Sequence, residues 1–155
     1  MHHDETKTTP IGMARYANEF YEACIAADDV IGIKPGYEIV APPPVLYLAG
    51  HSIELALKAF LLKGGVPLRR LPTKTYGHDL MKCFKKANEL GLISLHKFDQ
   101  VEVGAIRLLN ELYCSKQLNY IVTGEKLYPT FGLVQAFAKK LIDVVSKHVG
   151  YEHNA

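Results

Sequence analysis

Four polar side chains stand at helical spacing inside a very apolar stretch of this sequence, residues 45–62 (VLYLAGHSIELALKAFLL). On an α-helix of about 3.6 residues per turn, Tyr47, His51, Glu54 and Lys58 share one narrow stripe, while the other faces carry Leu, Ile, Ala and Phe. We call these four residues the polar stripe. An imidazole that titrates near neutral pH, placed beside a carboxylate and an amine, can transfer a proton or hold a phosphate. The stripe is therefore a candidate for acid–base chemistry or phosphate binding.

The same spacing also has a structural interpretation. A helix that is apolar on nearly every side is usually buried, and buried charges need partners. Glu54 and Lys58 form an i, i+4 pair in the favourable order, and His51 is expected to hydrogen-bond to Glu54 one turn away. We favour this interpretation, in which the network fixes the helix against its neighbours or lies at a dimer interface.

His78 and Asp79 precede another amphipathic segment. Asp79 favours the positive end of a helix, and His78 can simply pack back on the protein. The functional interpretation instead brings His78 close to Glu54 and His51. Two imidazoles and a carboxylate can hold a metal, but no second helix supplies a matching pair of ligands, so we predict neither a metal nor a cofactor.

The basic segment, residues 63–86, carries seven basic residues and a single acid, Asp79. Such a cluster is compatible with phosphate or RNA contacts, and it is also common on ordinary solvated surfaces. A tyrosine in it can stack on a base, although a packing role is more common. Further along, Tyr113, Lys116 and Tyr120 are spaced i, i+3 and i+7. The candidates for nucleotide or RNA contact are Lys63, Arg69, Arg70, Lys74, Tyr76, Lys82, Lys85, Lys86 and Tyr120.

Apolar periodicity predicts five helices and no convincing strand. They cover about 10–27, 44–63, 78–90, 95–115 and 130–148, with Pro and Gly residues between them. Residues 28–44 are expected to be irregular, with a short extended piece at 39–41. The helix at 95–115 is expected to turn inward Phe98, Val101, Ala105, Leu108, Leu109 and Leu112. The fold class is thus all-α: an up-and-down bundle of about five helices in one domain, 1–155, with 1–9 and 151–155 flexible.

Composition points to a soluble protein, since 48% of the residues are hydrophobic and 22% are charged. The N-terminus has no apolar leader, and the charges within 45–62 argue against a membrane span. Cys24, Cys83 and Cys114 are widely spaced and form no metal or redox motif, so we expect buried reduced thiols. We expect a cytoplasmic protein without membrane contact.

The segment GHSIELALKAFLLKGG, a basic loop and then YGHDLMKCFKKANELG resembles the HEPN superfamily, the higher eukaryotes and prokaryotes nucleotide-binding domains. The matching residues are Ser52-Ile53-Glu54-Leu55, Lys58-Ala59 and Gly77-His78-Asp79-Leu80, and LNELYCSKQLNY at 109–120 is similar more loosely. The resemblance implies a small helical bundle, often homodimeric and frequent in bacterial and archaeal defence and toxin–antitoxin systems. Many members are metal-independent ribonucleases. Their active-site motif is an arginine followed, after four to six residues of any type, by a histidine.

This chain departs from that ribonuclease motif. None of Arg15, Arg69, Arg70 and Arg107 has a histidine at the required distance, and the nearest approach is Arg70 to His78. We therefore expect a nucleotide- or RNA-binding accessory module of a defence, stress or toxin–antitoxin system, without a firm catalytic residue.

Two alternatives stay open. One is a divergent metal-independent ribonuclease that uses His78 or His51 with Arg69 or Arg70, with Glu54 as a further candidate. The other is a protein-interaction module without nucleic-acid contact. A homodimer is expected, and a nucleotidyltransferase or another protein is a possible partner.

Overall fold

The computed structural model describes residues 8–119 and 127–152 of the chain. Within these residues all regular structure is helical, so the predicted all-α bundle is confirmed. The elements are α1 (Pro10–Ile31), α2 (Pro43–Lys63), the 3₁₀ helix η1 (Leu68–Arg70), α3 (Leu80–Glu89), α4 (Leu92–Leu95), α5 (Gln100–Cys114) and α6 (Phe131–Val149).

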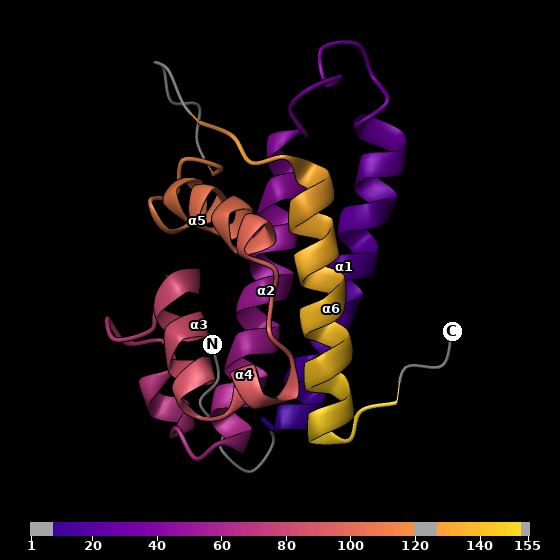
Figure 1. Cartoon of the computed structure of the whole chain (residues 1–155). Coiled ribbons are helices and arrows are strands. Elements are labelled where there is room, and N and C mark those ends of the chain that lie inside the picture. The colour runs from indigo at the N-terminus through magenta and orange to yellow at the C-terminus, as the bar shows by residue number, and fades with distance from the viewer. Residues whose placement is uncertain (1–7, 120–126, 153–155) are drawn as a thin grey trace.

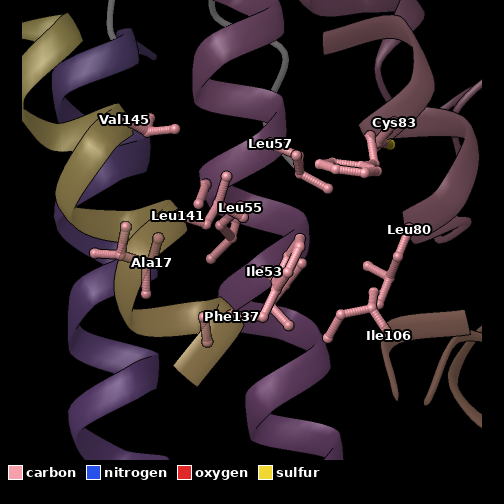
Figure 2. Packing of buried hydrophobic residues seen from close by; sticks show 14 of the residues in the cluster. Ala17, Ile53, Leu55, Leu57, Leu80, Cys83, Ile106, Phe137, Leu141 and Val145 are labelled. Carbon is pink, nitrogen blue, oxygen red and sulfur yellow. The ribbon is translucent and has the colours of Figure 1, made fainter. Parts of the chain in front are cut away.

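Helix α2 runs through the middle of the bundle, with α1 and α6 on one side and α3 and α5 on the other (Figure 1). Every residue from 52 to 61 is buried, whatever its direction around the helix. Figure 2 shows Leu55 on the side of Leu141 and Leu57 on the side of Cys83. The apolar residues all round α2 are therefore matched by neighbours all round it.

Helix α2 is also long and apolar enough to cross a membrane, and it alone is so among the described residues. However, 78% of its most apolar window is buried inside the bundle, as in the core helix of a soluble protein. Its apolarity is thus accounted for by the packing of α1, α3, α5 and α6 around it.

Helix α1 begins as expected but is longer than predicted. The Thr9 side chain accepts a hydrogen bond from the Gly12 amide (3.0 Å). Pro10 occupies the first turn, where the missing N–H group of proline costs no hydrogen bond within the helix. The helix continues to Ile31 rather than stopping near residue 27. The extended piece expected at 39–41 is absent, and Ile39 is 91% exposed.

The predicted helix at 95–115 is wrong at its start. The chain instead forms the short helix α4, passes through extended backbone at His96 and begins α5 at Gln100. Asp99 caps α5 by accepting from the Val101 amide at 2.7 Å. Phe98 does point inward, but from the connecting segment, and Val101 is 64% exposed rather than part of the inner stripe.

Candidate functional site

The centre of the candidate site is the carboxylate of Glu54, which is buried in the middle of α2. Its Oε2 accepts a hydrogen bond from Lys58 Nζ at 2.9 Å, which confirms the predicted i, i+4 pair. Its Oε1 accepts from the Tyr113 hydroxyl at 2.8 Å and lies 2.8 Å from His78 Nδ1. A buried carboxylate with three donors is well satisfied, so it can stay ionised without contact with water.

Lys58 is just as buried, with a side chain 2% exposed. Besides Glu54, its ammonium donates to the carbonyl oxygen of Gly77 at 2.6 Å. Gly77 has a φ of 46°, in the left-handed region that glycine adopts without steric cost. The turn that precedes α3 is thereby tied to the interior of α2.

His78 is brought to Glu54 as the functional interpretation of the sequence required, yet its side chain is 62% exposed. Because the ionised carboxylate can only accept, Nδ1 must carry the proton of this hydrogen bond. The other ring nitrogen, Nε2, then carries no proton and can accept a hydrogen bond. The arrangement fixes the tautomer and the direction of an exposed imidazole.

His51 does not contact Glu54 in the predicted way. Its Nδ1 lies 3.3 Å from the Tyr113 hydroxyl, and this hydroxyl uses its hydrogen on Glu54. The His51 ring packs edge-on against Phe20, with ring centroids 4.5 Å apart, and stacks on Tyr47 at 6.3 Å. The polar stripe is therefore connected through Tyr113, and its first residue, Tyr47, marks the solvent edge at 36% exposed.

Burial and charge act in opposite directions on these groups. Burial alone would raise the pKa of Glu54, but the Lys58 charge and the hydrogen bonds from His78, Lys58 and Tyr113 bring it below its ordinary value. The pKa of His51 is lowered, mainly because burial disfavours the imidazolium, although Glu54 opposes this. The pKa of Tyr113 is raised by burial and by the nearby Glu54 charge, so this hydroxyl remains a donor.

Gly50 allows Tyr113 to reach this carboxylate. A methyl group at position 50 would lie 2.5 Å from Cδ1 of the Tyr113 ring. Sequence reasoning noted Tyr113 for its spacing but missed its role and that of Gly50. The signal available was a glycine in the interior of an otherwise strongly helical segment, which often marks a close approach of another chain segment.

A small pocket of about 140 Å³ opens beside His78. It is lined by His78, Tyr47, Tyr113, Lys116 and Asn119, so an imidazole, an ammonium and a carboxamide converge on it. Lys116 follows α5 with a φ of 62°, which is unusual for a residue with a side chain. Backbone strain of this kind is concentrated at functional sites. We call this cavity the His78 pocket.

The apolar side chains of the basic segment are buried in the core, whereas most of its charged side chains are exposed. Leu68, Leu71 and Tyr76 are buried, and Tyr76 is only 5% exposed. Tyr76 therefore has the packing role that the sequence favoured and is not available to stack on a base, since its ring belongs to the core. The charged candidates of the segment are exposed, apart from the half-buried Lys86: Lys63, Arg69, Arg70, Lys74, Lys82 and Lys85.

Several predicted site residues do not join the Glu54 network. Arg70 lies in η1 with an exposed side chain. It does not line the His78 pocket, and within the described residues no hydrogen bond joins it to the Glu54 network. Tyr120 lies outside the described residues. Asp79 caps α3 through the amides of Met81 and Lys82, as its position before a helix predicted.

Asn110 of α5 joins this cap and was missed by sequence reasoning. Its Nδ2 donates to Asp79 Oδ1 at 3.1 Å, and its Oδ1 accepts from the Leu80 amide at 2.8 Å. The start of α3, and with it the neighbouring His78, is thus fixed to α5.

In the described part of the chain, no three His, Cys, Asp or Glu side chains are grouped so that they could hold a metal ion. Comparisons of the chain with protein-family models, with curated proteins and with solved structures find no match.

Proposed function

We propose that this protein is a HEPN-like accessory module that binds the phosphate of a nucleotide or of RNA, with the His78 pocket as its centre. The observation that carries the proposal is the position of His78, an exposed imidazole oriented by a buried carboxylate at 2.8 Å, whose Nε2 can accept a hydrogen bond from a ribose hydroxyl or a base. Lys116 supplies a positive charge and Asn119 a hydrogen-bond donor in the same pocket. Donors and charge of this kind favour an anion such as a phosphate oxygen.

Two further observations support a nucleic-acid ligand. The Tyr47 ring at the solvent edge of the pocket offers a flat surface on which a base can stack. The exposed charges of the basic segment begin at Lys63, the last residue of α2, and continue along α3, so they can contact phosphates on either side of a bound nucleotide. The resemblance to HEPN domains adds a homodimer, a cytoplasmic location and a place in a defence, stress or toxin–antitoxin system to the proposal.

The test is binding of a fluorescently labelled single-stranded RNA of about twelve nucleotides to the purified protein, followed by anisotropy at several salt concentrations. We expect the affinity to fall as salt rises, because phosphate contacts release bound counterions. Lys116→Met and the triple variant Arg69→Ala/Arg70→Ala/Lys74→Ala should each weaken binding about tenfold or more. The matched control is Lys139→Met, an exposed lysine of α6 that lies outside the pocket. Binding that is the same in all four proteins would contradict the proposal.

A divergent metal-independent ribonuclease is the second candidate function, and the Glu54–His78 pair is the observation that favours it. In this mechanism Nε2 of His78 takes the proton of the ribose 2′-hydroxyl as the 2′-oxygen attacks phosphorus, and the 5′-oxygen leaves with a proton from water. The product carries a 2′,3′-cyclic phosphate. Cleavage that resists chelators and disappears in His78→Ala would establish this function in place of simple binding. A stable complex with a specific protein, without RNA binding, would instead favour the protein-interaction module.

A further inference from the structure

A second and larger cavity lies on the outer side of α3, where this helix meets α5. It has a volume of about 730 Å³, and one wall is formed by Met81, Phe84 and Ile93. It shares no lining residue with the His78 pocket. Sites for small organic ligands have volumes of roughly 300–1,000 Å³ and mostly apolar walls. We call this cavity the α3–α5 groove.

Three cationic side chains reach the α3–α5 groove, Lys82 and Lys85 from α3 and Arg107 from α5. Among the residues that the structure describes, none of the three is paired with a carboxylate. The two acids of the groove are already engaged, since Asp79 caps α3 and Glu89 lies 3.7 Å from Lys86. The groove therefore offers uncompensated positive charge, with one planar guanidinium that can bind a phosphate through two parallel hydrogen bonds.

Asn88 stands between this groove and a smaller cavity of about 210 Å³ that shares its wall. Its Oδ1 is buried and has no hydrogen-bond partner in the described part of the chain. Asn110, the other carboxamide of the groove, uses both its ends on Asp79 and Leu80. Buried acceptors are almost always paired, so a ligand with an N–H group could, after a small rotation of the Asn88 carboxamide, supply the missing donor.

We propose that the α3–α5 groove is a second ligand site, separate from the His78 pocket, that binds a nucleoside phosphate. The phosphate contacts Arg107, Lys82 and Lys85, the base lies against Phe84 and Ile93, and an exocyclic amine of the base donates to Asn88. A flat ring can cover an apolar wall with one face while the other face stays in water. A hydrocarbon chain in such an open groove would leave much of its length in water, and an acidic helix uses its backbone donors internally.

The test is isothermal titration calorimetry with ADP at low salt. Wild-type protein should bind ADP, and Arg107→Met should weaken binding about tenfold or more, because a hydrogen-bonded charge pair is lost. Asn88→Leu should weaken it as well, while inorganic pyrophosphate, which has no base, should lose affinity in Arg107→Met but not in Asn88→Leu. Lys139→Met serves as the control and should leave ADP binding unchanged. ADP can also occupy the His78 pocket, so Lys116→Met should leave the binding that depends on Arg107 in place. Arg107 is exposed, so Arg107→Met should fold normally, and its thermal unfolding checks this.

Each contrary result has a distinct meaning. If wild-type protein does not bind ADP, or if Arg107→Met binds it normally, the proposal is wrong. If Lys116→Met alone abolishes ADP binding, the nucleotide occupies the His78 pocket, which overturns the second site and leaves the proposed function intact. If decanoate or an acidic helical peptide binds through Arg107 and ADP does not, the groove serves another ligand. If the variants of the His78 pocket all bind RNA normally, the proposed function is wrong, and the proposal of a second site is unaffected.

Discussion

The hydroxyl of Tyr113, near the end of α5, donates a hydrogen bond of 2.8 Å to Oε1 of Glu54, in the middle of α2. These residues are 59 positions apart in the chain, and their contact completes the set of donors around a buried charge. The same oxygen orients the exposed His78 ring. The stability of the core and the geometry of the candidate site thus depend on one carboxylate, which gives several of the following predictions.

Glu54→Gln should destabilise the protein by about 3–5 kcal/mol, because it leaves the buried Lys58 ammonium without a counter-charge. The double variant Glu54→Leu/Lys58→Met should cost less than the sum of the single variants, since it removes both charges. Urea unfolding gives these free energies. Asp143→Asn is the matched control, because it breaks an i, i+4 pair that is more than half exposed and should cost less than about 1 kcal/mol. Equal effects of Glu54→Gln and Asp143→Asn would contradict the buried pair.

Gly50→Ala should destabilise by about 1–3 kcal/mol, although alanine is the better helix former. The added methyl group would lie 2.5 Å from the Tyr113 ring, and this ring is held by Glu54 and the core. Gly104→Ala in α5 is the control, since apart from the backbone of the helix itself and the adjacent residues, no described atom lies within 4 Å of the added methyl group. It should stabilise by about 0.5–1 kcal/mol. Thermal unfolding of the two variants should therefore shift in opposite directions.

Stability should fall in two steps as the pH is lowered. The pKa of His51 in the folded protein is below its ordinary value of 6.5. As the pH falls below 6.5, the histidine is therefore protonated more readily in the unfolded chain than in the folded protein, and the free energy of unfolding decreases. The pKa of Glu54 is below 4.5, so a second loss begins as the pH falls below this value. Urea unfolding at a series of pH values measures both steps. His51→Gln should remove the first step and keep the second, and an unchanged profile in this variant would refute the assignment.

Lys116→Gly should weaken RNA binding while leaving the fold equally stable or up to about 1 kcal/mol more stable. The lysine has a φ of 62°, which costs roughly 1–2 kcal/mol for a residue with a Cβ, and the entropy of glycine in the unfolded chain offsets part of the gain. Lys116→Met keeps the unfavourable backbone conformation and loses only the charge. A stability gain in Lys116→Met as large as that in Lys116→Gly would show that backbone strain is not the cause.

One of the three cysteines should react with a thiol reagent in the folded protein. Cys24 and Cys83 are buried, and burial raises the pKa of each to about 12, which suppresses the reactive thiolate. Cys114 is exposed, contrary to the expectation that all three thiols are buried. Titration with Ellman's reagent should count one thiol in buffer and three in urea. Cys114→Ser should abolish the native reaction.

The long helices and most of their ends could be predicted because proline and glycine mark them. Pro10 begins α1, Pro42 caps α2 while Pro43 and Pro44 form its first turn, and Gly150 ends α6. The division between α4 and α5 could not be predicted, because Phe98 is buried from the segment that connects them, at a position that also fits a helical repeat. Apolar spacing shows which side chains are buried and does not distinguish a helix from a connecting segment that buries one residue.

The candidate site was predicted in part, for a related reason. The Glu54–Lys58 pair lies within one helix, where spacing along the chain determines distance. Tyr113 and Lys116 reach the same place through the packing of α5 on α2, which no local pattern encodes. The GHDL segment indicated His78, but its bond to Glu54 depends on how the basic segment folds back on α2.

The two bonds from α2 to the turn before α3, Lys58 to Gly77 and Glu54 to His78, close the basic segment into a loop anchored at both ends in the interior. Trypsin could cut this loop after its exposed arginines without releasing either half. The fragments on each side would remain associated through these two hydrogen bonds and the packing of α3 on α2. A nicked protein should therefore keep the elution volume of the intact chain and separate into two pieces only in denaturant.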